Sequence, residues 1–217
     1  MDDYTAPEWE RSALLTIDVQ RDFSLHDGVF FIPGTMEALP AMRSLAQVYR
    51  ELGLPIVHIV RLYHPDGSNA DLCRRSMIEG GVIMAAPGTP GSQIIEDLLP
   101  FPEATLEPEP LLQGNAQEIG AREWVMYKPR FGAFYKTNLE AFLRQLGITT
   151  LVVVGCNFPN CPRTTIYEAT ERDFRVVIVT DAVSGVYDRG IQELKNIGVK
   201  VLGSSEAVNE IKSAMQE

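Results

Sequence analysis

The stretch Leu151-Val-Val-Val-Gly-Cys-Asn-Phe-Pro-Asn-Cys-Pro-Arg-Thr-Thr165 decides the fold and contains the first candidate for chemistry. Its apolar run, residues 151–154, is typical of a buried parallel strand. Gly155 then opens a short turn, and helical composition begins near Cys161. Open α/β sheets bind ligands where a strand's carboxyl end turns into a helix, and the start of a helix favours a thiolate. We therefore interpret Cys161 as a candidate nucleophile.

The rest of the chain alternates between strand and helix patterns. The predicted strands cover residues 13–18, 55–60, 124–127, 151–154, 176–179 and 200–202. The predicted helices cover 35–52, 92–98, 137–146, 161–171, 188–196 and a last segment from about 205. Strands joined by helices pair in parallel through right-handed crossovers. We predict an α/β fold, a three-layer α/β/α sandwich whose six-stranded, mainly parallel sheet is doubly wound and Rossmann-like.

Length and spacing predict one domain over residues 1–217, with an irregular insertion at about 61–123. Proline and glycine recur throughout this insertion. A long irregular segment inside a compact domain is typically a lid, a binding loop or an oligomer contact. The first ten residues are polar, and we expect them to form a loose arm.

Charge and cysteine content narrow the class of protein. The formal net charge of −10 argues against nucleic-acid and anionic-membrane partners, because both require a basic face. The apolar runs are shorter than a membrane span. Three cysteines, Cys73, Cys156 and Cys161, form no even-numbered framework, which is typical of a reducing compartment. The amino terminus shows no secretion-signal pattern. We expect a cytoplasmic protein that acts on a small molecule.

Three polar residues stand at or just beyond the carboxyl ends of three different strands: Asp18, Lys128 and Cys161. Those ends share one edge of a parallel sheet, so the three side chains can converge. A thiol becomes a nucleophile when a base takes its proton or a positive charge lowers its pKa. Asp18 is the candidate base, and Lys128 the residue that stabilises the thiolate or orients the carboxylate.

The segments around these residues resemble the motifs of the isochorismatase-like cysteine hydrolases, which include nicotinamidases, N-carbamoylsarcosine and ureidoacrylate amidohydrolases and streptothricin hydrolase. Residues 14–23 are similar to the first motif, whose acid falls on Asp18. Residues 127–139 are similar to the second, whose lysine falls on Lys128. Residues 155–161 reproduce the spacing of the third, so the nucleophile falls on Cys161. The three motifs occur in the family's order and span nearly the whole chain.

The resemblance implies a cysteine amidohydrolase, for which we expect no cofactor. Such an enzyme would cleave a C–N bond of a small amide, ureide or carbamoyl compound through a thioester intermediate. The resemblance also implies a non-proline cis peptide at Cys156–Asn157. Backbone N–H groups of Asn157 and Cys161 would then form an oxyanion hole. Family members commonly form dimers or tetramers, so we expect a homo-oligomer.

Positions within the motifs suggest six residues of the substrate pocket: Gln20, Phe23, Arg130, Phe134, Tyr135 and Phe158. Phe158 and Pro159 depart from the third motif of better-known relatives, which points to altered specificity. Metal-binding nicotinamidases carry Asp-x-His-Pro after the second strand. Here Arg61-Leu-Tyr-His-Pro lacks the acid two residues before His64, and no second histidine follows. We therefore predict no metal.

Several alternatives remain open. The same scaffold could hydrolyse an ester or a vinyl ether, or serve as a non-catalytic binding protein. Cys161 could be small hydrophobic packing, Asp18 a loop cap and Lys128 a solvated lysine at a strand end. Cys156 and Cys161 could form a redox pair. A dinucleotide-binding protein is disfavoured, because no Gly-x-Gly-x-x-Gly follows the first strand.

Overall fold

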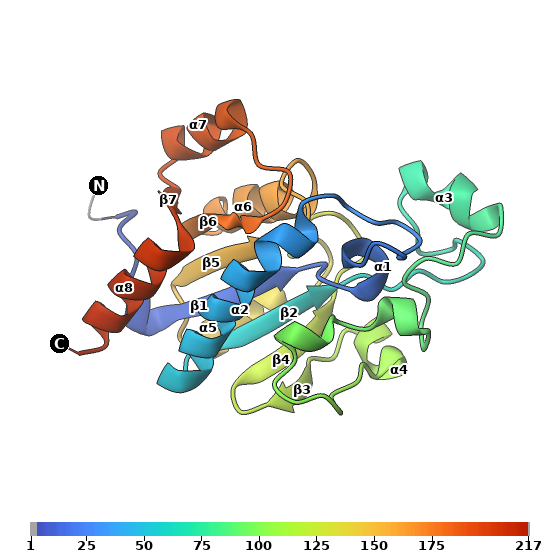
Figure 1. The fold of residues 1–217 in the computed structure, drawn as a ribbon, viewed down its shortest axis with the longest axis horizontal. Coiled ribbons are helices and arrows are strands. Elements are labelled where there is room, and N and C mark those ends of the chain that lie inside the picture. Colours follow the sequence, from blue (N-terminus) through green and yellow to red (C-terminus); the bar gives the residue numbers. More distant parts are fainter. Residues whose placement is uncertain (1–3, 217) are drawn as a thin grey trace.

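The computed structural model describes residues 4–216 and contains one seven-stranded sheet (Figure 1). Its strands are β1 (Ser12–Ile17), β2 (Ile56–Val60), β3 (Gln117–Gly120), β4 (Glu123–Tyr127), β5 (Thr150–Gly155), β6 (Arg175–Val183) and β7 (Lys200–Leu202). Their order across the sheet is β3-β4-β2-β1-β5-β6-β7. Every neighbouring pair is parallel except β3 and β4 at the edge. The central strands β1, β2 and β5 are buried throughout.

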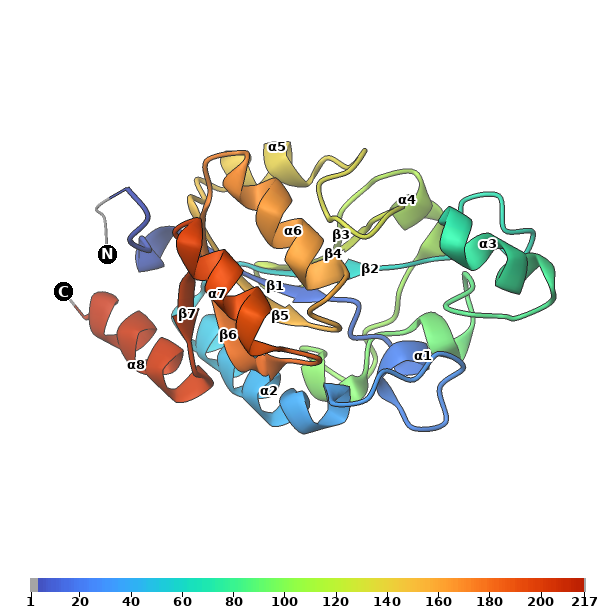
Figure 2. The same cartoon turned by 90° about the horizontal axis from the view of Figure 1, so that it is seen from above.

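Helices cover both faces of this sheet. They are α1 (Arg21–Ser24), α2 (Thr35–Leu52), α3 (Leu72–Glu79), α4 (Pro108–Leu112), α5 (Leu139–Gln145), α6 (Cys161–Thr170), α7 (Asp188–Asn196) and α8 (Ser204–Ala214). Short 3₁₀ turns occur at η1 (Trp9–Arg11), η2 (Pro90–Ser92) and η3 (Glu96–Leu98). Figure 2 shows α2 and α8 on one face and α5 and α6 on the other, and the apolar side chains of α7 belong to the same cluster as those of α5 and α6. The predicted three-layer α/β class is therefore confirmed.

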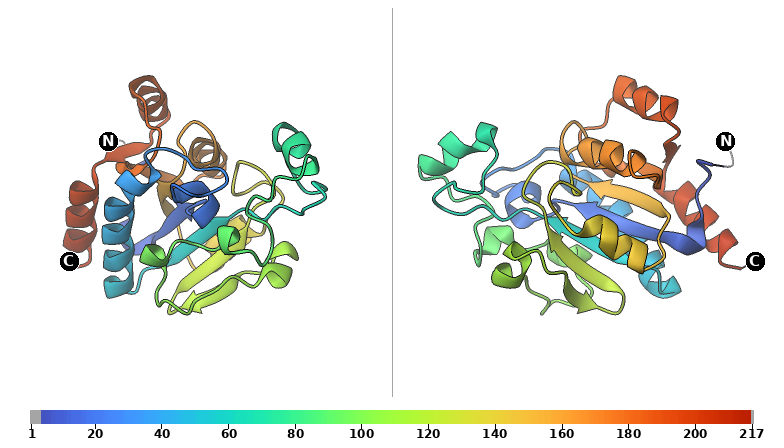
Figure 3. Two further views of the ribbon diagram at one scale, coloured as in Figure 1. Left: turned by 45° about the vertical axis from the view of Figure 1, so that its right-hand side comes forward. Right: turned by 180° about the vertical axis from the view of Figure 1, so that it is seen from behind.

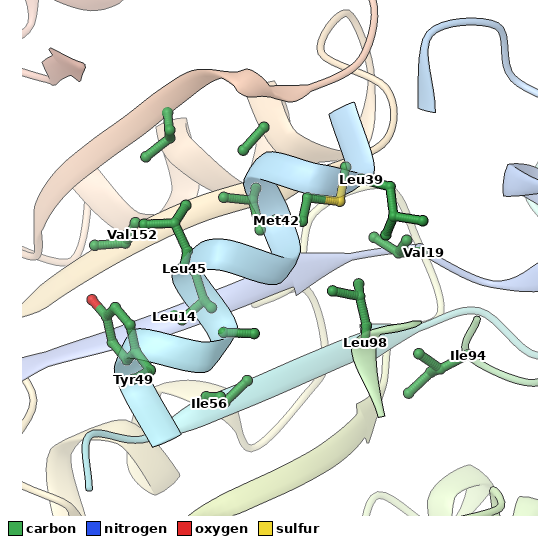
Figure 4. Close-up of a cluster of buried hydrophobic side chains, with 14 of the residues drawn as sticks. Leu14, Val19, Leu39, Met42, Leu45, Tyr49, Ile56, Ile94, Leu98 and Val152 are labelled. Carbon is green, nitrogen blue, oxygen red and sulfur yellow. The ribbon is translucent and has the colours of Figure 1, made fainter. Parts of the chain in front are cut away.

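The apolar stripe of α2 forms the core on the first face. Successive turns of the helix present apolar side chains to the sheet, which Figure 4 shows for Leu39, Met42, Leu45 and Tyr49. They pack on residues of three strands, Leu14, Ile56 and Val152. Burying each such side chain stabilises the fold by about 1.5–3 kcal/mol. Gly53 adopts a left-handed conformation and ends the helix, as the sequence predicted.

A second apolar cluster fills the opposite face, between the sheet and the helices α5, α6 and α7. Figure 3 shows α5 in yellow and α6 in orange lying across this face in its right-hand view. Leu143 of α5, Ile166 of α6 and Leu194 of α7 all belong to this cluster. These side chains come from helices whose apolar positions recur at helical spacing. The sheet is therefore covered on both faces, as parallel sheets require.

The sheet has one strand more than the six predicted. The additional strand, β3, lies in the segment 61–123 and pairs antiparallel with β4 at the edge. Ile119 is its one buried residue, while the residues beside it are exposed or half-buried. So short and polar a segment carries no clear period-two pattern, which is why sequence reasoning treated it as irregular.

The insertion also holds two helices that the sequence pattern did not predict, α3 and α4, while the helix predicted over 92–98 is two separate 3₁₀ turns. The insertion folds over the carboxyl ends of the parallel strands, where α3 and α1 lie at the end of the molecule opposite both termini (Figures 1 and 2). A small apolar cluster that includes Phe23, Ile78 and Cys156 fastens it there.

The amino-terminal segment is held in place from Glu8 onward. The N–H of Glu8 donates to the hydroxyl of Thr150 at 2.9 Å, and Trp9 is buried. The N–H of Thr149 donates to the carbonyl of Arg11 at 2.9 Å. The predicted loose arm is therefore wrong for these residues, because their backbone bonds extend from β1 to β5. Among the helices of residues 4–216, none has the length and apolar character to cross a membrane.

Candidate active site

The turn after β5 is built on a close approach between two strands. Gly155 has a φ of +118°, and a Cβ at this position would lie 2.3 Å from the carbonyl oxygen of Ile17 in β1. Only glycine accommodates both conditions. The peptide bond between Cys156 and Asn157 is cis. From there the chain passes to α6, whose first residue is Cys161.

Asp18 and Lys128 meet at the carboxyl edge of the sheet, on either side of β2. The N–H of Asp18 donates to Ile59 at 2.9 Å, and that of Lys128 donates to Val60 at 3.0 Å. These bonds to the end of β2 continue the parallel ladders and bring the two side chains together. The Nζ of Lys128 lies 2.8 Å from Oδ2 of Asp18. Lys128 is fully buried, so this ion pair is shielded from solvent.

Asp18 has an unusual backbone and a free oxygen. Its φ is +54°, a conformation that few residues other than glycine adopt. Its Oδ1 is buried and accepts no hydrogen bond within residues 4–216. Asp18 and Cys161 line the same pocket. The carboxylate can therefore accept the proton of the thiol on one oxygen while Lys128 holds the other.

Cys161 is a thiol at rest. Burial, together with the negative charge of Asp18, raises its pKa to about 12, although Lys128 and Arg61 act in the opposite direction. Sequence reasoning expected the helix start to favour the thiolate. That expectation is wrong for the resting state, because loss of solvent outweighs the positive charges. The proton must leave as the sulfur attacks.

Two backbone donors at this turn are directed toward the pocket rather than into the helix. Within the described part of the chain, neither the N–H of Asn157 nor that of Cys161 donates to any backbone or side-chain acceptor. Cys161 is the first residue of α6, where N–H groups have no acceptor within the helix. Both residues line the pocket. The two N–H groups are thus available to a ligand oxygen.

Cys156 has a different environment from Cys161. Its Sγ donates to the backbone carbonyl of Asp18 at 3.0 Å, and its N–H donates to Ile17 at 2.9 Å. Burial raises its pKa well above the ordinary value. Cys156 therefore fixes the backbone on which Asp18 stands. Its thiol points to that backbone and is free of any disulfide.

The pocket beside Cys161 is small and partly open to solvent. Apolar side chains supply much of its wall, and polar ones gather around Cys161. It is lined by Asp18, Phe23, Phe30, Ile32, Arg61, Tyr63, Arg74, Phe131, Cys156, Asn157, Asn160 and Cys161.

Arg61 and Tyr63 form a buried polar cluster that sequence reasoning missed. The guanidinium of Arg61 forms an ion pair with Asp71 and donates to the carbonyl of Lys128 at 3.4 Å. Its Nε donates to the hydroxyl of Tyr63 at 3.1 Å. One signal was available: Arg61 directly follows a predicted strand, at the same sheet edge as Asp18. Asp71 lies in the insertion, so the pairing could not be inferred from spacing.

The six predicted pocket residues separate into three groups. Phe23 lines the pocket. Arg130 and Tyr135 instead line a neighbouring groove, which shares Phe131 with the pocket. The other three predicted residues, Gln20, Phe134 and Phe158, are buried and line neither cavity.

Packing explains why those three residues lie elsewhere. The amide of Gln20 donates to Arg61 at 2.8 Å and to Ser92 at 2.7 Å, and accepts from the N–H of Arg61 at 2.7 Å. It therefore fastens the insertion to β2. Phe158 is fully buried against Tyr187, with ring centroids 5.3 Å apart. Phe134 packs against Phe174 at 5.8 Å. Their motif positions did not reveal which way these side chains point.

The structure gathers no metal-ligand set in the part of the chain it describes. Within residues 4–216, no three His, Cys, Asp or Glu side chains lie close enough together to hold a metal ion. Leu62 stands two residues before His64, and it is buried in the core. The N–H of His64 donates to the side chain of Asn69 at 2.8 Å.

The sequence matches a family model described as "Isochorismatase domain" over residues 12–206. A protein of Arabidopsis thaliana named "Probable inactive nicotinamidase" is 31% identical over 204 residues, which cover 90% of this chain and 93% of that protein. The crystal structure of an isochorismatase family protein from Desulfovibrio vulgaris is similar with a TM-score of 0.79 at 31% identity, covering 94% of this chain and 98% of that chain.

A third similarity is to the crystal structure of N-carbamoylsarcosine amidase from Thermoplasma acidophilum. It has a TM-score of 0.69 at 26% identity and covers 89% of this chain and 96% of that chain. The region matched by the family model contains Asp18, Lys128 and Cys161.

Proposed function

The chain belongs to the isochorismatase family, and on this premise we propose that it is a metal-independent cysteine amidohydrolase. It hydrolyses a C–N bond in a small amide, ureide or carbamoyl compound and releases ammonia or an amine. One observation carries the proposal. The carboxylate of Asp18 is held by Lys128 on one oxygen and, among residues 4–216, has no partner on the other, in the pocket that also contains the thiol of Cys161.

The first half-reaction forms a thioester. Oδ1 of Asp18 accepts the proton of Cys161 as the sulfur attacks the substrate carbonyl carbon. Negative charge then develops on the carbonyl oxygen, where the N–H groups of Asn157 and Cys161 can donate. Each such donor contributes about 2.7–4 kcal/mol in the transition state. Asp18, now protonated, gives its proton to the leaving nitrogen, and the C–N bond breaks.

The second half-reaction returns the free enzyme. Asp18 takes a proton from water, the resulting hydroxide attacks the thioester carbon, and the C–S bond breaks. The proton passes from Asp18 back to the sulfur. Lys128 keeps its hydrogen bond to Oδ2 through both halves, so the carboxylate stays aimed at the sulfur. Without that cation the buried negative charge would be unpaired.

A screen for ammonia release tests the proposal. Small amides, ureides and carbamoyl compounds are incubated with the wild-type protein and with the variants Cys161→Ala and Cys156→Ala. Cys161→Ala should abolish turnover while circular dichroism and unfolding remain those of the wild type. Cys156→Ala should keep measurable turnover, because the thiol of Cys156 donates to the backbone carbonyl of Asp18 and takes no part in the proposed steps. Full activity of Cys161→Ala would refute the mechanism.

A non-catalytic binding protein is the second candidate, since the Arabidopsis relative carries the name "Probable inactive nicotinamidase". In that case compounds of the panel would bind without being consumed. Calorimetry together with the ammonia assay separates the two functions. Esters and vinyl ethers belong in the same panel, and their selective hydrolysis would redirect the proposal to another bond on this scaffold.

A further inference from the structure

Arg74 enters the wall of the pocket from outside the sheet. It lies in α3 of the insertion and lines the same pocket as Cys161. Its guanidinium carbon stands 4.0 Å from the centroid of the Phe30 ring, which also lines the pocket. An aromatic ring fixes the position of a guanidinium that lies over its face. The N–H groups at the edge of the guanidinium can still donate to a ligand.

Within the described part of the chain, nothing balances the charge of Arg74. No ion pair or side-chain hydrogen bond formed within residues 4–216 includes its guanidinium. Arg61, the other cation of the pocket lining, has Asp71 as its ion-pair partner, which Arg130 also approaches at 3.9 Å, and Lys128 is paired with Asp18. Arg74 therefore gives the pocket one uncompensated positive charge, in a chain whose formal net charge is −10.

We propose that Arg74 selects substrates that carry a carboxylate at the end remote from the scissile amide. This inference rests on the proposed function and specifies its substrate class. The planar guanidinium matches a carboxylate with two parallel N–H···O bonds. With its carboxylate on Arg74 of α3, such a substrate turns its neutral amide toward the thiol of Cys161. A single unpaired arginine fits a single negative charge.

Arg74 and the residues proposed for bond cleavage lie on different parts of the fold. Asp18, Lys128 and Cys161 stand on the sheet edge, whereas Arg74 belongs to the insertion that folds over this edge. Apolar residues such as Phe23 and Ile32 line the pocket as well.

The test compares two matched series of compounds. Malonamate, succinamate and glutaramate each carry one amide and one carboxylate; malonamide, succinamide and glutaramide replace the carboxylate with a neutral amide of the same shape. Ammonia release gives kcat/KM for the wild type, Arg74→Gln and Arg74→Lys. Arg75→Gln is the matched control, because it removes the same charge from the same helix and Arg75 does not line the pocket.

The wild type should prefer at least one acid over its diamide. Arg74→Gln should lower kcat/KM for that acid by about 10- to 100-fold, as expected for the loss of a charged hydrogen-bond partner. The value for the diamide should change by less than about 3-fold, and Arg74→Lys should restore part of the preference. Arg75→Gln should keep the wild-type ratio. An unchanged ratio in Arg74→Gln would overturn the proposal.

Binding to the inactive variant Cys161→Ala tests the role of Arg74 separately from the amidohydrolase activity. Calorimetry measures the three acids with Cys161→Ala and with Cys161→Ala/Arg74→Gln. Binding that disappears with Arg74 supports the proposal even if no amide of either series is hydrolysed, an outcome that would count against the amidohydrolase alone. Equal binding by both variants, or no binding of any acid to Cys161→Ala, would refute the role of Arg74.

Discussion

The Nζ of Lys128 and the Oδ2 of Asp18 lie 2.8 Å apart in a site where the lysine has no exposed surface. Two opposite charges are thereby removed from water together, at the ends of strands β4 and β1. Their attraction has to offset the loss of hydration of both groups. Each charge therefore depends on the other, which has consequences for stability as well as for chemistry.

Replacing Lys128 with Met should destabilise the protein by about 3–5 kcal/mol, since Asp18 would be left buried without its partner. Turnover should fall as well, because the carboxylate of Asp18 loses the hydrogen bond that orients it toward Cys161. Urea unfolding followed by circular dichroism measures the first effect. Lys212→Met is the control: its ammonium lies 3.8 Å from Glu51 in an exposed pair, so its loss should cost about 0–1 kcal/mol. Equal losses of unfolding free energy in Lys128→Met and Lys212→Met would contradict the importance of the buried ion pair.

Alkylation of Cys161 by iodoacetamide should be slow at neutral pH and should keep rising with pH. Burial and the charge of Asp18 raise the pKa of this thiol to about 12. Below that pKa the thiolate fraction increases about tenfold per pH unit, whereas an ordinary thiol levels off above about pH 8.5. The experiment needs a Cys73→Ser background, because Cys73 is exposed and would react first.

In the same background, Asp18→Asn should speed the alkylation of Cys161 at pH 8. The substitution removes the negative charge that opposes the thiolate and leaves Lys128 to favour it. Mass spectrometry of the labelled peptide identifies the modified cysteine. A rate that is unchanged or slower in Asp18→Asn would mean that the carboxylate does not act on the thiol.

Glu123 should contribute stability that is lost in acid. Burial disfavours its charge, but hydrogen bonds from Arg50 and His58 dominate and lower its pKa below the ordinary value of 4.5. The charged form is therefore stabilised on folding. This contribution is complete above about pH 4.5 and declines as pH falls through the lowered pKa.

The variant Glu123→Gln should lose about 3–5 kcal/mol near pH 7, because Arg50 and His58 lose their buried anion. Its stability should then fall less steeply than that of the wild type below about pH 4.5. Urea unfolding at several pH values tests both points. Glu96→Gln breaks an exposed pair with Arg21 and should leave the pH profile unchanged. Parallel profiles for wild type and Glu123→Gln would contradict this interpretation.

Elements with long, strongly patterned sequences could be predicted closely. The helix at 35–52 has apolar residues at helical spacing and a glycine stop, and it forms with those bounds. The strands predicted at 13–18 and 151–154 could be recognised from their runs of apolar residues alone. By contrast, β3 has one buried residue, Ile119, and its position depends on pairing with β4. Pairing of this kind is a tertiary effect that a local pattern does not contain.

The site could be predicted where it depends on strand ends. Because parallel strands end at one edge, Asp18, Lys128 and Cys161 could be expected to lie near one another without coordinates. The residues that come from the insertion could not be found this way. Arg74 reaches the pocket only because α3 folds back over the sheet, and the direction of Phe158 depends on how the turn packs against Tyr187.

The arrangement of the insertion also has a practical meaning for protein engineering. The residues proposed for bond cleavage stand on rigid strand ends and a helix start, whereas Arg74 stands on a peripheral helix. Libraries restricted to residues 72–79 can therefore be searched for new preferences without altering the nucleophile, its base or their support. A scaffold organised in this way can acquire a new substrate by changing one connecting segment.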